Sequence, residues 1–400
     1  MRSKGFLIVV SSLILISCLV FIWGCGSVSK GGGGGSVVPS GITRLYLAGR
    51  GNYIYAFNVE SLTIESSIYL PLANTFVHGV ALSPDKRTLY ALGVPNWYFG
   101  YDYHLTDPLH GNWLLYAIDL ATRDLSFTYI VPADINYTWL GCYLAVTPDG
   151  QRIITASKLK PAVLSFSTSP LSFEAYTPTD GGDPSYPCGL VISADGRYAY
   201  VGNWAYNGSI SSSEVYKYDI AAKTIVGTVE LDPGYGIGMP SFNPAGDKLY
   251  VPSPYDSGTG KVFIIDLAPD FTLETTSIDV GNYPWGIGFS ADGKKAYVTN
   301  MIDNSILVVS TEVGAYYKVL TDEAGSVPCN VVMDHARNRA YVNGREDGYI
   351  TIIDTINDTV EAQIVIDSRS DQITPASVMT NSAAGPQGKN SRQSIRPMAF

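Results

Sequence analysis

The chain has 400 residues, of which 46% are apolar and only 16% charged, a composition too apolar for a disordered protein. Its 40 glycines and 28 tyrosines favour short strands joined by tight turns over a helical bundle. The net charge of −10 provides no basic surface, so we expect no nucleic-acid partner.

The first 24 residues have the pattern of an export signal. Two cations precede a largely apolar run over 6–23, and a Gly-Cys junction follows. This junction resembles that of a bacterial lipoprotein signal, in which the cysteine becomes the lipidated first residue. We therefore predict a signal peptide over 1–24 and lipidation at Cys25. Cys18 is a competing lipidation site, and an uncleaved anchor is a further alternative because this largely apolar run of eighteen residues nearly spans a bilayer.

Residues 25–41 are predicted to form a flexible tether after the lipidated cysteine. They include five consecutive glycines at 31–35 and few side chains that can pack. A coil of this length has an end-to-end distance of roughly 20–25 Å. We expect a folded domain that begins at residue 42 and lies just off a membrane surface in the cell envelope.

One pattern recurs over 42–384. In its clearest copy, 283–311, strand A leads through a Ser-x-Asp-Gly turn to strand B, and strand C follows a short loop. Strand B recurs seven times at separations of 44, 64, 46, 50, 47 and 44 residues, which match a four-stranded propeller blade apart from one insertion. The anchor residues of strand B are Tyr46, Tyr90, Ile154, Tyr200, Tyr250, Tyr297 and Tyr341.

The two ends of the repeat predict how the ring closes. The first copy begins at strand B, whereas 375–381, after the last copy, reads as a spare strand A. We predict an all-β, seven-bladed β-propeller with four-stranded antiparallel blades, in which this C-terminal strand completes the first blade as its innermost strand. Residues 385–400 are predicted to form a flexible C-terminal tail.

The sequence around the clearest turn identifies a family resemblance. SADGKK followed by AYVTN, at 290–300, resembles the YVTN-repeat β-propeller family, and the resemblance covers about 340 residues. Similar propellers include lactonases, cytochrome d1-like haem domains, surface-layer proteins and exported binding proteins. The resemblance therefore implies the fold and leaves the activity open.

The recurring aspartates are expected to be structural. Those of the A–B turns can accept hydrogen bonds from nearby backbone N–H groups, and a second set recurs where strand C meets the next turn. We expect both sets to cap turns and not to catalyse. The first set is Asp85, Asp149, Asp195 and Asp292, and the second is Asp119, Asp219, Asp266 and Asp354.

The B–C loops share one face with the D–A loops and the starts of strand A, which surround the channel mouth. In regular blades the strand B anchor and the end of strand C are 12–13 residues apart. In the blades anchored by Tyr90, Tyr200 and Tyr250 this separation is 29, 19 and 16 residues, so their B–C loops are enlarged. Aromatic residues in these loops predict a binding platform, or else packing of the long loop onto its own propeller. The binding candidates are Trp97, Tyr98, Phe99, Tyr101, Tyr103, Trp113 and Trp204.

Seven equivalent positions at the starts of strand A form a predicted ring at the channel mouth. They are His78, Cys142, Cys188, Gly238, Trp285, Cys329 and Ala376. Thiolates and an imidazole suit a soft metal or a haem, so the metal candidates are His78, Cys142, Cys188 and Cys329. In one alternative Cys142 and Cys188 form a disulfide between adjacent blades, and in another the cysteines are small buried residues. No position is acidic, which argues against a Ca²⁺ site like that of some propeller lactonases.

These features predict a membrane-tethered, exported binding or scaffold module that uses this face and has a protein or glycan partner in the cell envelope. We find no Ser-His-Asp arrangement, phosphate-binding loop, zinc-protease helix or CxxCH haem attachment, so we assign no catalytic residue and no definite cofactor. The alternative is a metal- or haem-binding redox protein or a lactonase-like hydrolase at the channel mouth. A purely structural role in a cell-envelope layer is a third possibility.

Overall fold

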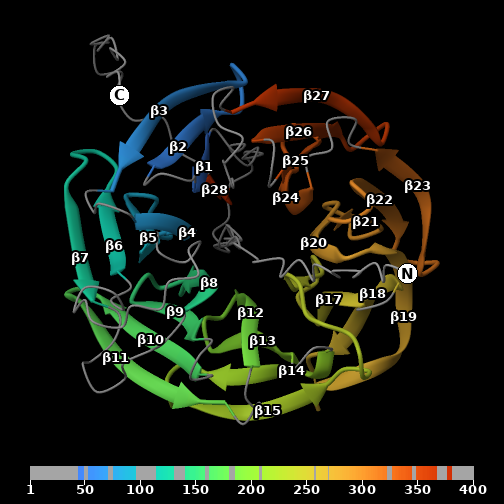
Figure 1. Cartoon of the computed structure of the whole chain (residues 1–400), viewed down its shortest axis with the longest axis horizontal. Coiled ribbons are helices and arrows are strands. Elements are labelled where there is room, and N and C mark those ends of the chain that lie inside the picture. Colours follow the sequence, from blue (N-terminus) through green and yellow to red (C-terminus); the bar gives the residue numbers. More distant parts are fainter. Residues whose placement is uncertain are drawn as a thin grey trace, which may run out of the picture.

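The computed structural model describes residues 44–48, 53–70, 75–95, 114–129, 140–157, 162–179, 185–206, 210–255, 258–268, 270–321, 327–344, 348–366 and 376–380. Every regular element in these ranges is a β-strand, and the strands form seven four-stranded antiparallel sheets around a central channel (Figure 1). The predicted seven-bladed propeller is therefore confirmed. The described ranges contain no helix long and apolar enough to cross a membrane.

The seven blades follow the chain, and each runs from its inner strand A to its outer strand D. Blade 1 contains β28 (Ala376–Thr380), β1 (Arg44–Ala48), β2 (Tyr53–Asn58) and β3 (Thr63–Tyr69). Blade 2 contains β4 (Thr75–Leu82), β5 (Thr88–Pro95), β6 (Leu114–Asp119) and β7 (Leu125–Tyr129). Blade 3 contains β8 (Leu140–Val146), β9 (Arg152–Ser157), β10 (Ala162–Thr168) and β11 (Leu171–Pro178).

The remaining four blades have the same order. Blade 4 contains β12 (Ser185–Ile192), β13 (Tyr198–Tyr206), β14 (Ile210–Asp219) and β15 (Thr224–Glu230). Blade 5 contains β16 (Ser241–Phe242), β17 (Lys248–Tyr255), β18 (Gly258–Asp266) and β19 (Thr272–Asn282). Blade 6 contains β20 (Pro284–Phe289), β21 (Lys295–Asn300), β22 (Ser305–Ser310) and β23 (Ala315–Thr321). Blade 7 contains β24 (Pro328–Asp334), β25 (Arg339–Gly344), β26 (Tyr349–Asp354) and β27 (Thr359–Val365).

The first blade contains strands from both ends of the propeller. β28 pairs antiparallel with β1, with Arg44 opposite Thr380 and Ala48 opposite Ala376. β28 thereby takes the inner position that β4 and β8 take in the next blades (Figure 1). The predicted closure by a C-terminal strand is confirmed, and it pairs the edge of β1 that would otherwise be open.

The repeated turn residues hold the hairpins as expected. In the A–B turn of blade 2, the Ser83 hydroxyl donates to Asp85, and the Thr88 N–H donates to the Ser83 hydroxyl. In the C–D turns, Asp119, Asp219 and Asp354 each accept two backbone N–H bonds. Asp266 instead lies 3.7 Å from the Lys248 ammonium. These aspartates are therefore structural.

The repeated strand B anchors form the core between blades. All seven are at most 7% exposed, and burial raises the pKa of Tyr200 to about 12. The Tyr200 ring meets Phe242 of blade 5 edge-on, with ring centroids 5.6 Å apart. Such aromatic pairs contribute about 0.5–1.5 kcal/mol beyond the area they bury. The sequence repeat is therefore a packing repeat.

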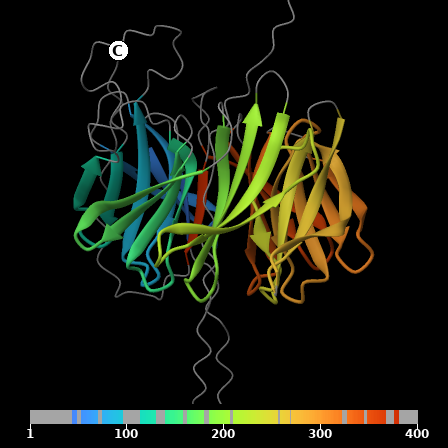
Figure 2. The ribbon, with the colours of Figure 1, turned by 90° about the horizontal axis from the view of Figure 1, so that it is seen from below.

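Blades 4 and 5 have longer strands than the regular blades. β13, β14 and β18 contain 9, 10 and 9 residues, whereas β21, β22, β25 and β26 contain 6 each. The additional residues that the sequence places between strands B and C in these blades therefore largely extend the sheets. Figure 2 shows the ring from the side, with its strands running between the two faces.

Candidate functional site at the channel mouth

The seven predicted ring positions all belong to the inner strand of their blades or its start. His78 lies in β4, Cys142 in β8, Cys188 in β12, Trp285 in β20, Cys329 in β24 and Ala376 in β28, and Gly238 lies three residues before β16. These strands surround the channel (Figure 1). The side chains of His78, Cys142, Cys188 and Ala376 lie outside the described part of the chain.

The pairing register between strands A and B shifts at the ring position in four blades and directly beside it in blade 4, where Cys188 is paired and Gly189 is the extra residue. In β4 the pairing register shifts between Val77 and Gly79, which leaves His78 as the extra residue. The corresponding shifts lie at Leu140/Leu144 in β8, Cys188/Leu190 in β12, Pro284/Ile287 in β20 and Pro328/Val331 in β24. A bulge takes a residue out of the regular alternation of a strand and changes the direction of its side chain. The bulges therefore mark the ring as the irregular part of an otherwise regular fold.

An aromatic pair connects opposite sides of the channel. Trp285 of blade 6 is fully buried, and its indole N–H donates to the Tyr143 hydroxyl of blade 3 over 3.0 Å. Tyr143 is itself only 2% exposed. The ring of Tyr283 stacks on Trp285, with centroids 6.0 Å apart and planes 8° apart. Aromatic side chains therefore join blades 3 and 6 across the middle of the ring.

Close backbone contacts support this aromatic pair. The Met239 N–H of blade 5 donates to the Trp285 carbonyl of blade 6 over 2.7 Å. A Cβ at Gly286 would lie 2.4 Å from the Cys329 carbonyl oxygen of blade 7, so this position has no room for a side chain. Cys329 is 2% exposed and belongs to the same apolar cluster as Trp285 and Met239. Its buried position agrees with the alternative in which the ring cysteines are small core residues.

The backbone adopts unusual conformations two residues before the ring in blades 6 and 7. Tyr283 and Val327 have φ angles of 58° and 50°. The left-handed region is unfavourable for a β-branched residue such as valine. The Met301 N–H donates to the Tyr283 carbonyl, and the Asn304 side chain accepts the Val327 N–H. Most other non-glycine residues with positive φ, such as Lys86 and Arg123, lie in the A–B and C–D turns of the opposite face, so the strained backbone does not by itself mark a site.

The metal hypothesis gains no ligand set from the described side chains. Within them, no group of three or more His, Cys, Asp or Glu residues is placed to hold a metal ion. Cys329 is the metal candidate whose side chain is described, and its thiol lies 3.6 Å from the Val327 carbonyl oxygen. Because the other three candidate side chains are outside the described part, the metal site and the Cys142–Cys188 disulfide stay predictions.

Most of the predicted aromatic platform lies outside the described residues. This holds for Trp97, Tyr98, Phe99, Tyr101, Tyr103 and Trp113. Trp204 lies within β13 and is 9% exposed, packed in the main apolar cluster. The Trp204 ring therefore contributes chiefly to the core of the described propeller.

A second aromatic group on the same face was only partly visible in the sequence. Tyr235 precedes strand A of blade 5, and Tyr255 ends β17. Their ring centroids are 4.6 Å apart, and the Lys261 ammonium lies 5.4 Å from the Tyr235 centroid. Gly234, with φ of 87°, lets the chain pass directly over the Tyr255 ring, where a Cβ would approach to 2.7 Å. The glycines around Tyr235 were the available signal, because a bulkier residue could not make this contact.

Comparisons with known proteins agree on the fold. No protein-family model matches the chain. It is 26% identical over 116 residues to the uncharacterized protein YncE of Escherichia coli (strain K12). That match covers 28% of this chain and 32% of YncE, so it spans about a third of the relative's length.

Two solved structures illustrate the range of proteins that share this architecture. The periplasmic gluconolactonase PpgL of Pseudomonas aeruginosa has a TM-score of 0.58 and 15% identity, covering 83% of this chain and 98% of that one. Dihydro-heme d1 dehydrogenase NirN, in complex with DHE, has a TM-score of 0.55 and 16% identity, covering 83% of this chain and 65% of that one. At these identities the likeness concerns the fold alone.

Proposed function

We propose that the chain is an exported, lipid-anchored propeller that binds a protein or glycan of the cell envelope through the face carrying the B–C loops and the channel mouth. The observation that carries the proposal is the Tyr235–Tyr255 pair beside Lys261 on this face. Both rings are half-buried and held by ring contacts and backbone bonds. Such fixed amphipathic rings next to a cation supply contact area at little entropic cost, which suits a partner or a sugar ring.

The centre of the face favours binding over catalysis. Trp285 and Tyr143 fill the described part of the channel between blades 3 and 6 with buried aromatic side chains. The rim differs, because Tyr235, Tyr255 and Lys261 all retain partial exposure. A partner would therefore contact the rim and the loops that rise from it.

The point at which the chain enters the propeller supports the orientation of this face. β1 begins at Arg44, opposite Thr380 at the end of β28, so the chain enters at the face of the A–B and C–D turns. A tether over 25–41 would join the propeller on that side. The B–C face would then point away from the membrane, toward partners in the periplasm or the exterior.

A photo-cross-linking experiment tests the proposal. A photoreactive amino acid is placed at Tyr255, or at Ile356 in a C–D turn of the opposite face as the control, where the side chain is 67% exposed. In intact cells we expect position 255 to give defined cross-linked adducts that disappear when Tyr235→Ala is added. Position 356 should give none of these adducts. Equal adducts from both positions, or none from position 255, would contradict the proposal.

A metal- or haem-binding redox protein or a lactonase-like hydrolase is the second candidate function. The observation that favours it is the set of five bulges, two of which span Cys142 and Cys329, while a third lies directly beside Cys188. Elemental analysis of chain purified without chelator, compared with Cys188→Ser and Cys329→Ser variants, distinguishes it. About one equivalent of a transition metal that is lost in the variants would make the channel mouth a cofactor site, whereas a metal-free wild type would exclude a tightly bound metal.

A further inference from the structure

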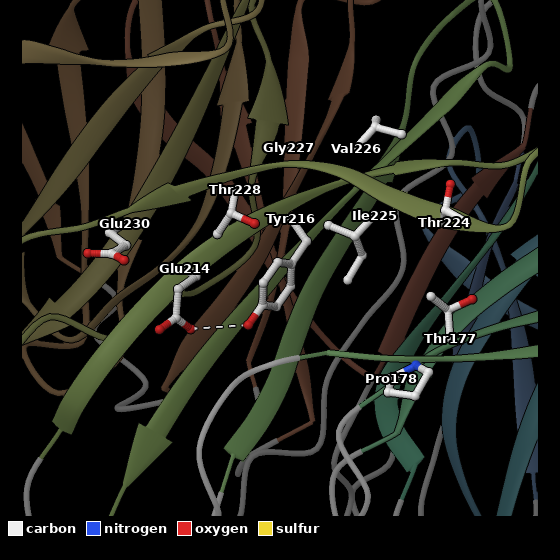
Figure 3. A pocket seen from close by; sticks show the side chains of 10 residues that line it. All are labelled: Thr177, Pro178, Glu214, Tyr216, Thr224, Ile225, Val226, Gly227, Thr228 and Glu230. Carbon is white, nitrogen blue, oxygen red and sulfur yellow. Dashed lines mark hydrogen bonds between the residues drawn. The ribbon is translucent and has the colours of Figure 1, made fainter.

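A groove of about 670 Å³ runs along the outer wall between blades 3 and 4 (Figure 3). One wall is Thr177 and Pro178 at the end of β11. Strands β14 and β15 form the rest, including nearly every residue of β15 from Thr224 to Glu230. Because β15 is the last strand of its sheet, its outer edge pairs with no other described strand.

Two carboxylates face each other in this groove. Glu214 of β14 lies directly opposite Glu230 of β15 in the antiparallel register. Asn203 on β13 donates to the Glu214 carboxylate over 3.0 Å, and the Tyr216 hydroxyl lies 3.5 Å from the same oxygen (Figure 3). Tyr216 is 3% exposed, so it forms a fixed floor. Like charges directly opposite each other in a sheet are destabilising, and a cation would relieve this repulsion.

The other outer strands neutralise their glutamates. Glu65 pairs with Arg44, Glu174 with Arg152, Glu274 with Lys248 and Glu361 with Arg339, each within one blade. Among the described residues, neither Glu214 nor Glu230 has an ion-pair partner. Glu214 and Glu230 therefore form an acidic pair without an ion-pair partner among the described residues. They lie at the opposite end of the outer strand from the four ion pairs above, which are beside the C–D turns.

The chain contains a segment of complementary charge. Residues 385–400 carry Lys389, Arg392 and Arg396 and no Asp or Glu, in a protein with a net charge of −10. The propeller ends at Thr380, and the twelve residues from there to Arg392 reach about 40 Å when extended. β28 lies at the centre of the ring in blade 1 and β15 on the outer wall of blade 4 (Figure 1), so the tail has to cross one face of the ring to reach the groove.

We infer that this groove is a docking site for an extended basic peptide and that its occupant is the C-terminal tail, 385–400, of the same molecule. The tail lies along the free edge of β15, where backbone pairing holds an extended segment. Arg392 and Arg396 share one side of the extended segment, because side chains alternate along a strand, and this side faces the acidic pair Glu214 and Glu230. A partner that carries a similar basic segment would have to displace the tail.

Limited trypsin digestion of the full chain in detergent tests this inference, with mass spectrometry reporting cleavage after Lys389, Arg392 and Arg396. A docked tail is cleaved only when it opens, so we expect cleavage about tenfold faster in Glu214→Gln/Glu230→Gln than in the wild type. The exposed-site variant Glu230→Gln alone, which leaves the buried bonds of Asn203 intact, should give an intermediate rate. Raising NaCl to 0.5 M should bring the wild type to the rate of the double variant.

The control is Glu312→Gln, whose side chain is 65% exposed in a turn of blade 6. It should leave the cleavage rate unchanged. A photoreactive amino acid in place of Ile395 should cross-link to β15 within one molecule. Equal rates in all variants, a cross-link elsewhere, or a cross-link between two chains would overturn the inference.

Discussion

The hydrogen bond across the channel makes the sharpest prediction about stability. In Tyr143→Phe the indole N–H of Trp285 loses its acceptor at a position where the indole is fully buried. A buried donor left without a partner costs about 1–3 kcal/mol. Unfolding entropy of about 2.1 cal/mol/K per residue, summed over about 340 residues, is near 0.7 kcal/mol/K, so the melting temperature should fall by about 1–4 °C.

The measurement is a melting curve by circular dichroism, with the free energy of unfolding from urea titration as the second readout. Tyr69→Phe is the matched control, because Tyr69 is 49% exposed and should change stability by less than about 0.5 kcal/mol. A double-mutant cycle with Trp285→Phe should give a coupling energy of about 0.5–1.5 kcal/mol. A loss no larger than that of the control, together with zero coupling, would refute the argument that this bond joins blades 3 and 6.

Three further predictions concern other links in the ring. Asp358 of blade 7 accepts bonds from Lys295, Tyr297 and Tyr317 of blade 6; burial alone would raise its pKa, but these bonds outweigh it and lower the pKa. Asp358→Asn should therefore cost about 1–3 kcal/mol at pH 7 in urea titrations. This stabilisation is fully present above the unfolded-state pKa of about 3.9 and is lost as the pH falls through the lower folded-state pKa. The unfolding free energies of wild type and variant should therefore converge as the pH falls below about 4, and they should stay apart above pH 7. Gly286→Ala should cost at least about 3 kcal/mol or prevent folding, because its Cβ would overlap the next blade's backbone, whereas Gly258→Ala, with its nearest neighbour at 3.9 Å, should change the melting temperature little. Truncation after residue 375 removes β28, so it should lower the melting temperature sharply and cause aggregation that light scattering detects. Truncation after residue 384 keeps β28 and should do neither. Similar melting curves for the two truncated chains would contradict the role of β28 in closure.

The fold could be predicted because its signals are local. The A–B turns of blades 2, 3, 4 and 6 each carry a Ser or Thr two residues before an Asp, and the strand B anchors recur at nearly constant spacing apart from one insertion. The closing strand could be recognised because 375–381 resembles a strand A and the first copy lacks one. The period also aligned the seven ring positions, since equivalent positions in a repeat occupy equivalent places.

The site was less accessible because its contacts are not local. Tyr143 and Trp285 are 142 residues apart and meet only because blades 3 and 6 face each other across the channel. The bulges were also hidden, because a register shift depends on how strands A and B pair and not on either sequence alone. The extra residues of blades 4 and 5 read as loops, although most of them extend β13, β14 and β18. Trp204 therefore lies in a strand and packs inside.

These differences bear on function. A propeller repeats one packing unit, so departures from the repeat are the positions where packing alone does not decide the residue. In the described chain such departures are the ring bulges, the Tyr235–Tyr255 pair and the unneutralised Glu214 and Glu230. Buried aromatic side chains, Trp285 and Tyr143, lie at the ring bulges, whereas the tyrosine pair and the two glutamates are partly exposed to solvent. Binding at the rim and on the outer wall therefore requires no movement of the buried Trp285–Tyr143 pair.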